Sequence, residues 1–499
     1  MDISPNKTLL NMFKKWLHDY YVDWNTFANI GAFIFLGLLT LRALTHLDTS
    51  WDSLAYHLPF AARLANIYPS NEYIFSDYYE SIYAGVPVLT EWGQGWLWRI
   101  TGLVSAANLI GFISMLLVVG VAVKELGVKF WMAVLFFFSI PLVSIHSVSS
   151  YNDLACNSFI SIAFINWIAS CEKDQFDLRK LVSVLIPLAI AANMKYQAIL
   201  TSGIFFALAI LFFLYKNKQS LLSGNVSKIH WALVLSFCAI LFGCKLLFNL
   251  FQHDNPFYPL ASKIGPLYFE GPVSVGLAGE APDVKPYFRY LMSLSELKMW
   301  TDNRGSLWSV DMWTSAKVDL SLYSKTGGYF VANLVLWAAV IFVAFLYAGT
   351  QKMKMYSIFV LSSFIFVGFL PVSYYLRYWM FLPINLAVLV LLLYSKSDST
   401  QKPFFYLTTI LQVAIFVFVM YQIKGDVFPE SFRPGYLTSS VSALYAPSSS
   451  KPEEAVGPQL CVVSEDTRQG FLYKLSHPRD FIQFSTDLSD CISDTILSP

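Results

Sequence analysis

Long apolar runs, each followed by a short polar stretch, recur from residue 27 to residue 422. A run of about 18 to 20 apolar residues is long enough to cross roughly 30 Å of hydrocarbon as a helix. One long run is interrupted by Asn193, Lys195 and Gln197, so we expect two helices with a break there rather than one continuous helix. The pattern predicts eleven membrane-spanning helices, at 27–45, 103–123, 130–147, 154–171, 180–193, 197–215, 231–250, 330–348, 356–372, 379–394 and 404–422.

The composition supports this interpretation. With 56% hydrophobic and only 13% charged residues among 499, the chain is too apolar for an ordinary soluble protein. The net charge of +1 lacks the basic excess typical of nucleic-acid-binding proteins, so we expect no nucleic-acid partner. The first 26 residues do not read as a cleavable signal peptide, because the apolar run that follows them is long enough to span.

The distribution of Lys and Arg predicts an orientation. Short cytoplasmic loops collect these residues, and here they gather in every second loop. We therefore expect a cytoplasmic N-terminus at 1–26, a transmembrane domain at 27–422 and an outer C-terminal segment at 423–499. The long loops 46–102 and 251–329 fall on the outer face as well. The prediction is a multi-pass protein of the inner (plasma) membrane whose polar sites face the periplasm or the outside.

The first outer loop opens with two carboxylates and two imidazoles directly after an apolar run. Helical spacing of its apolar residues predicts an amphipathic helix in the interface, with Asp48 and Asp52 on one face. A partly desolvated Asp52 could accept a proton from an attacking hydroxyl, or it could simply face water. Asp48 is equally well explained as a helix N-cap. His57 could bind an acceptor or a phosphate, or it could be structural.

Three further polar groups fall on the same face. Asp153, at the end of the segment 149–153, could cap the following helix or share a site with Asp52. Lys195 and Arg377 are the only cations of the short outer loops, against the general charge distribution. Such cations suit a phosphate, which Arg binds through paired hydrogen bonds and Lys as a point charge. Alternatively, they extend toward lipid headgroups without specificity.

Several common catalytic motifs are absent from the sequence. It contains no Walker A, GxGxxG, HExxH or GxSxG motif and no cysteine pair with zinc-ligand spacing. Nucleotide-driven chemistry, dinucleotide redox chemistry and serine hydrolysis therefore lack support. A nucleotide-sugar donor would also be on the wrong side of the membrane. Cys461 and Cys491, in the outer C-terminal segment, could form a disulfide or remain free thiols.

The polar motifs resemble those of the GT-C superfamily of polytopic glycosyltransferases, in particular the dolichyl-phosphate-mannose protein mannosyltransferases and the bacterial lipid A aminoarabinose transferases. The segment Asp52-Ser53-Leu54-Ala55-Tyr56-His57-Leu58-Pro59 is similar to the family's first acidic motif, with Ser53 in place of the usual Glu. The other matches are Tyr151-Asn152-Asp153-Leu154-Ala155, Lys195-Tyr196, Asn255-Pro256-Phe257-Tyr258-Pro259, and Arg377-Tyr378 with Pro383. In order, they cover most of residues 27 to 400.

The resemblance implies an all-α integral membrane protein: a GT-C-like bundle of about eleven transmembrane helices with interfacial helices in the first outer loop and a small outer C-terminal segment. It implies transfer of a hexosyl or pentosyl sugar, with inversion, from a polyprenyl-phosphate-linked donor to a glycan, lipid or protein acceptor, with membrane lipid around the enzyme. Asp52 would be the catalytic base, and Asp153 would orient the acceptor or assist the base. Substrate binding would fall to Tyr56, His57, Lys195, Tyr196, Arg377 and Tyr378. No cofactor is certain, and Ser53 leaves a divalent metal possible.

Two other classes of protein remain open at this point. A transporter or flippase for a lipid-linked solute needs polar groups at mid-membrane and on both faces, whereas this sequence concentrates them on the outer face. A non-catalytic partner in envelope assembly is compatible with the loss of the usual acidic pair at Ser53.

Overall fold

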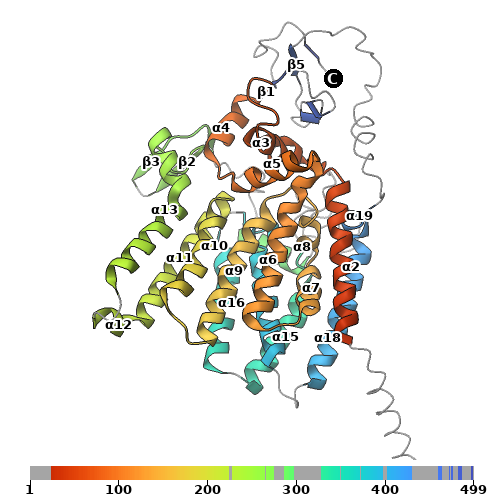
Figure 1. Ribbon diagram of the computed structural model, residues 1–499, viewed down its shortest axis with the longest axis vertical. Coiled ribbons are helices and arrows are strands. Elements are labelled where there is room, and N and C mark those ends of the chain that lie inside the picture. Colours follow the sequence, from red (N-terminus) through yellow and green to blue (C-terminus); the bar gives the residue numbers. More distant parts are fainter. Residues whose placement is uncertain are drawn as a thin grey trace, which may run out of the picture.

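The computed structural model describes residues 24–223, 227–264, 266–274, 286–296, 328–348, 350–370, 372–396 and 402–429, and short segments at 459–463, 471–472, 474–475, 481–485 and 496–497. A helix lies over each of the eleven predicted spans (Figure 1). These helices are α2 (Trp24–Thr45), α6 (Leu109–Leu126), α7 (Phe130–Phe138) with α8 (Pro141–His146), α9 (Asp153–Glu172), α10 (Leu178–Ala192), α11 (Tyr196–Lys216), α13 (Lys228–His253), α15 (Val331–Ala348), α16 (Gln351–Gly368), α17 (Phe381–Lys396) and α18 (Lys402–Gln422).

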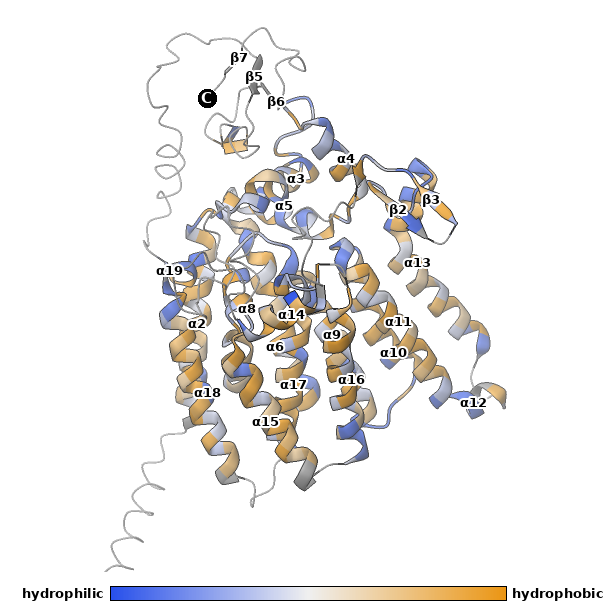
Figure 2. Cartoon of the chain, turned by 180° about the vertical axis from the view of Figure 1, so that it is seen from behind, coloured by the Kyte–Doolittle hydropathy of each residue, from blue (hydrophilic) through white to orange (hydrophobic). Residues whose placement is uncertain are grey.

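The bundle has the character of a membrane domain, as predicted. Six of the described helices are long and apolar enough to cross a membrane: Asn25–Thr45, Val104–Leu126, Asp153–Glu172, Tyr196–Lys216, Lys228–His253 and Phe404–Gln422. Apolar residues cover the bundle over most of its length, whereas hydrophilic residues gather at its two ends (Figure 2). The all-α membrane fold expected from the sequence is thereby confirmed.

The predicted break near residue 194 is present. Helix α10 ends at Ala192 and α11 begins at Tyr196. The Asn193 side-chain amide donates to the carbonyls of Ala189, at 2.8 Å, and Leu241, at 2.9 Å. Because these carbonyls accept from a side chain, the interruption costs little hydrogen bonding in a setting without water.

The third predicted span differs from the expectation of one helix, because it consists of α7 and α8 with a break between them. Pro141 stands in the first turn of α8, where its missing N–H costs nothing. Side chains donate to backbone carbonyls at the break: Ser144 Oγ donates to the Phe138 carbonyl at 2.6 Å, and Asn333 Nδ2 donates to the Ser139 carbonyl at 2.8 Å. These two carbonyls therefore keep hydrogen-bond partners where the helix is interrupted.

Four side chains around this break form what we call the inner polar cluster: Ser139, Asn333, Trp337 and Gln412. Gln412 Nε2 donates to Ser139 Oγ at 2.7 Å and to Asn333 Oδ1 at 3.0 Å, and its Oε1 accepts from Trp337 Nε1 at 2.8 Å. All four residues are buried. The inner polar cluster ties α15 and α18 to the broken helix.

The first outer loop is mostly helical. Its elements are η1 (Ser53–His57), α3 (Leu58–Leu64), β1 (Tyr73–Ile74), α4 (Asp77–Gly85), α5 (Leu89–Thr101) and η2 (Val104–Asn108). Helices α3 and α5 pack closely, since a Cβ at Gly95 would collide with the Ala61 carbonyl. A helix is present from Trp51 to Leu64, where the interfacial helix is expected, but most of its residues are buried in the protein and Asp48 precedes it. The prediction that Asp48 and Asp52 share a helix face is therefore wrong.

The described parts of the second outer loop and of the C-terminal segment lie at the same end of the bundle as the first outer loop (Figure 1). The elements there are β2 (Leu260–Ile264), β3 (Leu267–Phe269), β4 (Val273–Ser274), α14 (Pro286–Ser295), η4 (Leu376–Trp379), α19 (Lys424–Val427), β5 (Gln459–Val463), β6 (Phe481–Ser485) and β7 (Ile496–Leu497). The C-terminal strands join the first outer loop in one parallel sheet of order β1-β6-β5-β7. Cys491 lies outside the described residues, and so does most of the N-terminal segment 1–26.

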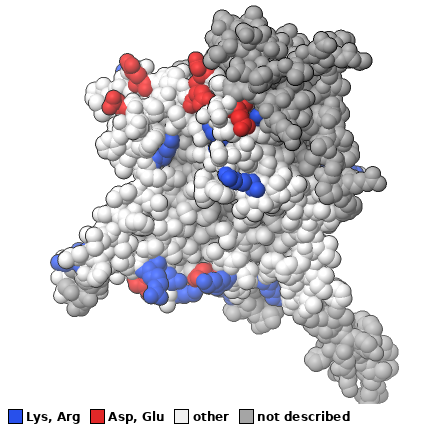
Figure 3. Space-filling view, turned by 45° about the horizontal axis from the view of Figure 1, so that its top comes forward, with Lys and Arg blue, Asp and Glu red and all other residues white. Residues whose placement is uncertain are grey.

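Lysine and arginine side chains gather at the opposite end of the bundle (Figure 3). Ion pairs there join Lys173 to Glu125 at 2.9 Å and Lys352 to Asp174 at 2.9 Å. These residues come from loops that the sequence pattern assigns to the cytoplasm. The polarity of the bundle thus follows the charge distribution on which the predicted orientation depends.

Candidate active site

Two ion pairs meet at the end of the bundle opposite to the lysine-rich end, the end that the sequence pattern assigns to the outer face. Arg377, on η4, donates to Asp52 Oδ2 at 2.8 Å, although the two residues are 325 positions apart. Lys195, in the break between α10 and α11, pairs with Asp153 in the first turn of α9. The four charged residues that the sequence selected are therefore brought together in two pairs.

The Tyr378 ring connects these pairs, and the Tyr151 ring contacts one of them. The Tyr378 ring lies 4.6 Å from Lys195 Nζ and 5.1 Å from the Arg377 guanidinium carbon. The Tyr151 ring lies 4.9 Å from the same guanidinium. Cations over aromatic faces are attracted by the ring quadrupole, more strongly where water is excluded. We call Asp52, Asp153, Lys195, Arg377 and Tyr378 the outer ionic cluster.

Both pairs are shielded from water, but to different degrees. The side chains of Arg377 and Asp52 are each 15% exposed, whereas those of Lys195 and Asp153 are 10% and 0% exposed. Burial is the largest single influence and lowers the pKa of Lys195, but the Asp153 carboxylate, together with Tyr378 and Cys156, outweighs it, and the pKa lies above its ordinary value. Lys195 is thus held as a cation at a site with little water.

A wide helical turn presents the first acidic motif. Residues Ser53–His57 form a π-type turn, in which each N–H bonds five residues back rather than four. In an α-helix, residues five apart point about 140° away from each other, whereas the wider turn brings them toward one line. Relative to an α-helix, this turn therefore brings His57 toward the side of Asp52. Burial, and then the Asp52 carboxylate, raise the pKa of Tyr56 well above its ordinary value, so it remains a neutral phenol.

Glu91 of α5 belongs to this region and was not predicted from the sequence. Its Oε1 lies 2.7 Å from His57 Nδ1 and accepts from Asn152 Nδ2 at 3.1 Å. Asn152 directly precedes Asp153, so Glu91 connects the turn that carries Asp52 to the turn that carries Asp153. His57 itself is fully buried, so its side chain is not exposed at the surface of the outer ionic cluster.

The Asp48 carboxylate has a structural role, because it holds neighbouring groups by hydrogen bonds. Its carboxylate accepts from Ser50 N at 3.0 Å, from Ser53 Oγ at 2.6 Å and from Ser150 N at 2.9 Å. These bonds fix the start of the helix Trp51–Leu64 and fasten it to the loop before Asp153. Because the Asp48 carboxylate is engaged in these bonds, we do not assign it the role expected of Asp52.

The Tyr196 side chain lies in a different environment from that of its neighbour Lys195. Its hydroxyl donates to the Gly85 carbonyl at 3.0 Å and to the Tyr258 carbonyl. The hydroxyl therefore links α4 to the segment Asn255–Pro259 that opens the second outer loop. The structure does not bring it into the outer ionic cluster, so the expectation that Tyr196 contacts substrate gains no support from its contacts.

The outer ionic cluster and its surroundings are incompletely bonded. Among the described residues, no hydrogen-bond partner is found for Asp153 Oδ2, Arg377 Nε, His57 Nε2 or Glu91 Oε2. Buried polar atoms without partners are uncommon and typically mark a place for water, an ion or a ligand. Within the same described residues, no group of three or more His, Cys, Asp or Glu is arranged to hold a metal ion.

Comparisons with known proteins were made for the whole chain. No protein-family model matches it, and no curated protein matches it. Among solved structures it is similar to ArnT from Cupriavidus metallidurans, both bound to undecaprenyl phosphate and in the apo state. The sequence identities are 12% and 13% and the TM-scores 0.47 and 0.49, over 92% of this chain and 85% of each neighbour.

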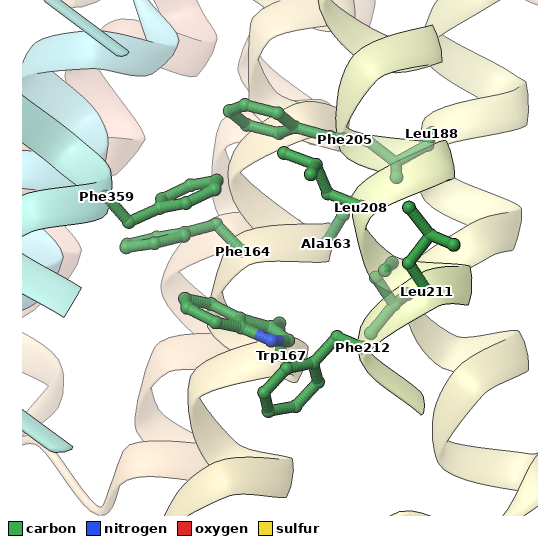
Figure 4. Close-up of a pocket in the computed structure, with 11 residues that line it drawn as sticks. Ala163, Phe164, Trp167, Leu188, Phe205, Leu208, Leu211, Phe212 and Phe359 are labelled. Atoms are coloured by element: carbon green, nitrogen blue, oxygen red, sulfur yellow. The ribbon is translucent and has the colours of Figure 1, made fainter. Parts of the chain in front are cut away.

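An apolar cavity lies deeper in the bundle, between α9, α10, α11 and α16 (Figure 4). Its volume is about 310 Å³. Phe164 and Phe359 stack on one side of it with ring centroids 5.6 Å apart, and Trp167 lies below them (Figure 4). Leu208 and Leu211, on the other side, are 47% and 64% exposed on the surface that membrane lipid would cover. The side chains that line the cavity are thus apolar.

Proposed function

We propose that this protein is a membrane glycosyltransferase that transfers a sugar from a polyprenyl-phosphate-linked donor to an acceptor on the outer face of the membrane. The observation that carries the proposal is the outer ionic cluster. It combines two carboxylates with two cations at the end of the bundle opposite to the lysine-rich end. Acid–base chemistry and phosphate binding need these two kinds of group side by side.

In the proposed reaction, Asp52 accepts the proton of an acceptor hydroxyl. The hydroxyl oxygen forms a bond to the anomeric carbon while the bond from that carbon to the phosphate oxygen breaks, and the electron pair leaves with the lipid phosphate. Attack from the face opposite to the phosphate inverts the anomeric centre. Asp153, beside Lys195, orients the acceptor or assists the base.

Negative charge accumulates on the phosphate as it leaves. Arg377 and Lys195 are placed to stabilise that charge, and the low exposure of both strengthens the interaction relative to water. Removing a preorganised group that stabilises developing charge typically costs about 2.7–4 kcal/mol of transition-state stabilisation. The two cations thus have the largest share of the proposed catalysis.

In this proposal the hydrocarbon chain of the donor occupies the apolar cavity. Ala163, in its lining, lies ten residues after Asp153 along α9, which corresponds to about 15 Å. A polyprenyl chain attached to a phosphate at the outer ionic cluster is long enough to reach this depth. The exposed Leu208 and Leu211 leave a route from surrounding lipid.

The function is tested by comparing envelope glycans from cells that carry the wild-type chain, Asp52→Asn or no copy of the gene, using mass spectrometry. We expect one sugar modification to be lost both with Asp52→Asn and without the gene. Asp77→Asn is the matched control, because Asp77 is an exposed carboxylate of the same outer loop, and the modification should persist in it. Full modification with Asp52→Asn contradicts Asp52 as the base.

A second measurement separates transfer from transport. Purified protein in detergent, supplied with the lipid-linked sugar and acceptor, should release free polyprenyl phosphate without any membrane gradient. Movement of the intact lipid-linked sugar across a vesicle membrane without covalent change would instead support a flippase.

A further inference from the structure

The proposed base and one proposed phosphate ligand neutralise each other in this structure. The Arg377 guanidinium donates to Asp52 Oδ2 at 2.8 Å. As long as this pair persists, Asp52 Oδ2 is occupied by the guanidinium and is less open to an approaching hydroxyl. Arg377 likewise has one fewer donor available for phosphate.

The two ion pairs differ in how readily they can separate. In the Lys195–Asp153 pair the carboxylate is 0% exposed, and separation would leave an uncompensated charge in the interior. In the Arg377–Asp52 pair both side chains are 15% exposed. Water and a second anion can therefore compensate the charges of the Arg377–Asp52 pair at a lower cost.

Arg377 is also held in a way that allows an exchange of anions. Its guanidinium lies over the rings of Tyr151 and Tyr378, and its Nε has no hydrogen-bond partner among the described residues. Contacts with flat ring faces depend weakly on the direction of the donor groups. The guanidinium can thus turn from a carboxylate to a phosphate while it keeps these aromatic contacts.

From these contacts we propose that Arg377 is the exchanging cation of the site. The phosphate of the lipid donor replaces Asp52 on Arg377, and the released Asp52 becomes the base. Lys195 stays with Asp153 and positions the phosphate as a fixed charge. Donor therefore binds before the acceptor hydroxyl is activated, and a site without donor has no free base. The inference rests on the proposed function, since it takes a lipid phosphate as the ligand.

The experiment measures binding of undecaprenyl phosphate to the full-length protein in nanodiscs. In Asp52→Asn, the carboxylate no longer competes for Arg377, so we expect about three- to tenfold tighter binding than in the wild type, although transfer is lost. Asp153→Asn should give no such tightening, because Lys195 does not exchange. The uncharged polyprenol of equal length should bind all variants alike, since it lacks the phosphate.

The outcomes separate the inference from the function on which it rests. If the wild-type protein binds undecaprenyl phosphate no better than the polyprenol, the proposed donor is wrong. If it prefers the phosphate but Asp52→Asn binds it equally or more weakly, the exchange is wrong. Tightening in Asp153→Asn alone would assign the exchange to Lys195 instead of Arg377.

Folding of each variant is followed by thermal unfolding in the same nanodiscs. Should Asp52→Asn fail to fold, Asp52→Ser tests the same point, because it also removes the charge that competes for Arg377. The tighter binding expected of either variant distinguishes exchange from a merely structural role, since loss of structure weakens binding.

Discussion

The inner polar cluster and the outer ionic cluster are both buried groups of polar side chains, yet their bonding differs. In the inner cluster, each side-chain donor and acceptor of Asn333, Trp337 and Gln412 has a partner, and the residues are neutral. In and behind the outer cluster the groups are charged or titratable. Asp153 Oδ2, Arg377 Nε and Glu91 Oε2 have no partners among the described residues.

This difference separates a structural role from a chemical one. A closed, neutral network gives back the hydrogen bonds that a broken helix loses and leaves nothing free for a ligand. Buried charges with free bonding capacity cost stability and persist where something else uses them. Substitutions in the inner polar cluster should therefore change stability alone, whereas substitutions in the outer ionic cluster should change transfer.

The largest effect is expected from Lys195→Ala, which leaves Asp153 buried without its cation. Removing one partner of a buried pair costs about 3–5 kcal/mol, and the phosphate also loses a fixed charge. We expect both a large fall in unfolding temperature and loss of transfer. The double variant Lys195→Met with Asp153→Leu should recover much of the stability but none of the transfer. Recovery of both would make the pair purely structural.

Gln412→Leu should affect stability alone. It removes bonds to Trp337, Asn333 and Ser139 and should destabilise the bundle by about 1–3 kcal/mol. Transfer per folded molecule should not change, because the inner polar cluster offers nothing to substrate. The control is Val413→Leu, a neighbour that is 43% exposed toward lipid, which should leave unfolding unchanged. A lower turnover of folded Gln412→Leu would overturn the structural assignment.

Arg377→Lys should change donor binding rather than stability, the reverse of what is expected of Gln412→Leu. It keeps the charge near Asp52 but loses the planar fork that binds phosphate through two bonds. We expect stability within about 1 kcal/mol of the wild type and about tenfold weaker donor use, read as a higher KM for the lipid-linked sugar. An unchanged KM with lower stability would instead assign Arg377 a structural role, like that of the inner polar cluster.

Tyr378→Phe should have the smallest effect. It removes a 3.3 Å hydrogen bond from Arg377 but keeps the ring near both cations. We expect less than about a threefold loss of transfer, in line with about 0.5 kcal/mol for one weak bond. Tyr378→Leu, which removes the ring as well, should lose more in a parallel assay. Equal losses in the two variants would assign the role to the hydroxyl.

Much of the fold followed from local patterns. Apolar runs predicted the helices, and Asn193 with Lys195 predicted the break because polar groups are costly inside a bilayer. The charge distribution placed Asp52, Asp153, Lys195 and Arg377 at one end, where the structure brings them together.

The pairing within the site was not predictable, because no local signal says which of two cations meets which of two carboxylates far away in sequence. Glu91 was missed for a related reason: it sits in an ordinary helical segment, and its partners His57 and Asn152 come from other elements. Its acidic side chain in a tryptophan-rich helix was the available signal. The relation of Asp48 to Asp52 was wrong because the helix begins only at Trp51.

The parallel sheet at the outer end joins early and late parts of the chain. Tyr73 of β1 is aligned with Ile482 of β6, and Phe471 packs near Tyr68 and Trp98 of the first outer loop. During synthesis, β1 is complete long before its partner strand exists. The loop that carries Asp52 therefore acquires this partner strand only after residue 485 has been synthesised. A chain truncated before residue 481 would leave this edge of β1 unpaired and open to pairing with other chains.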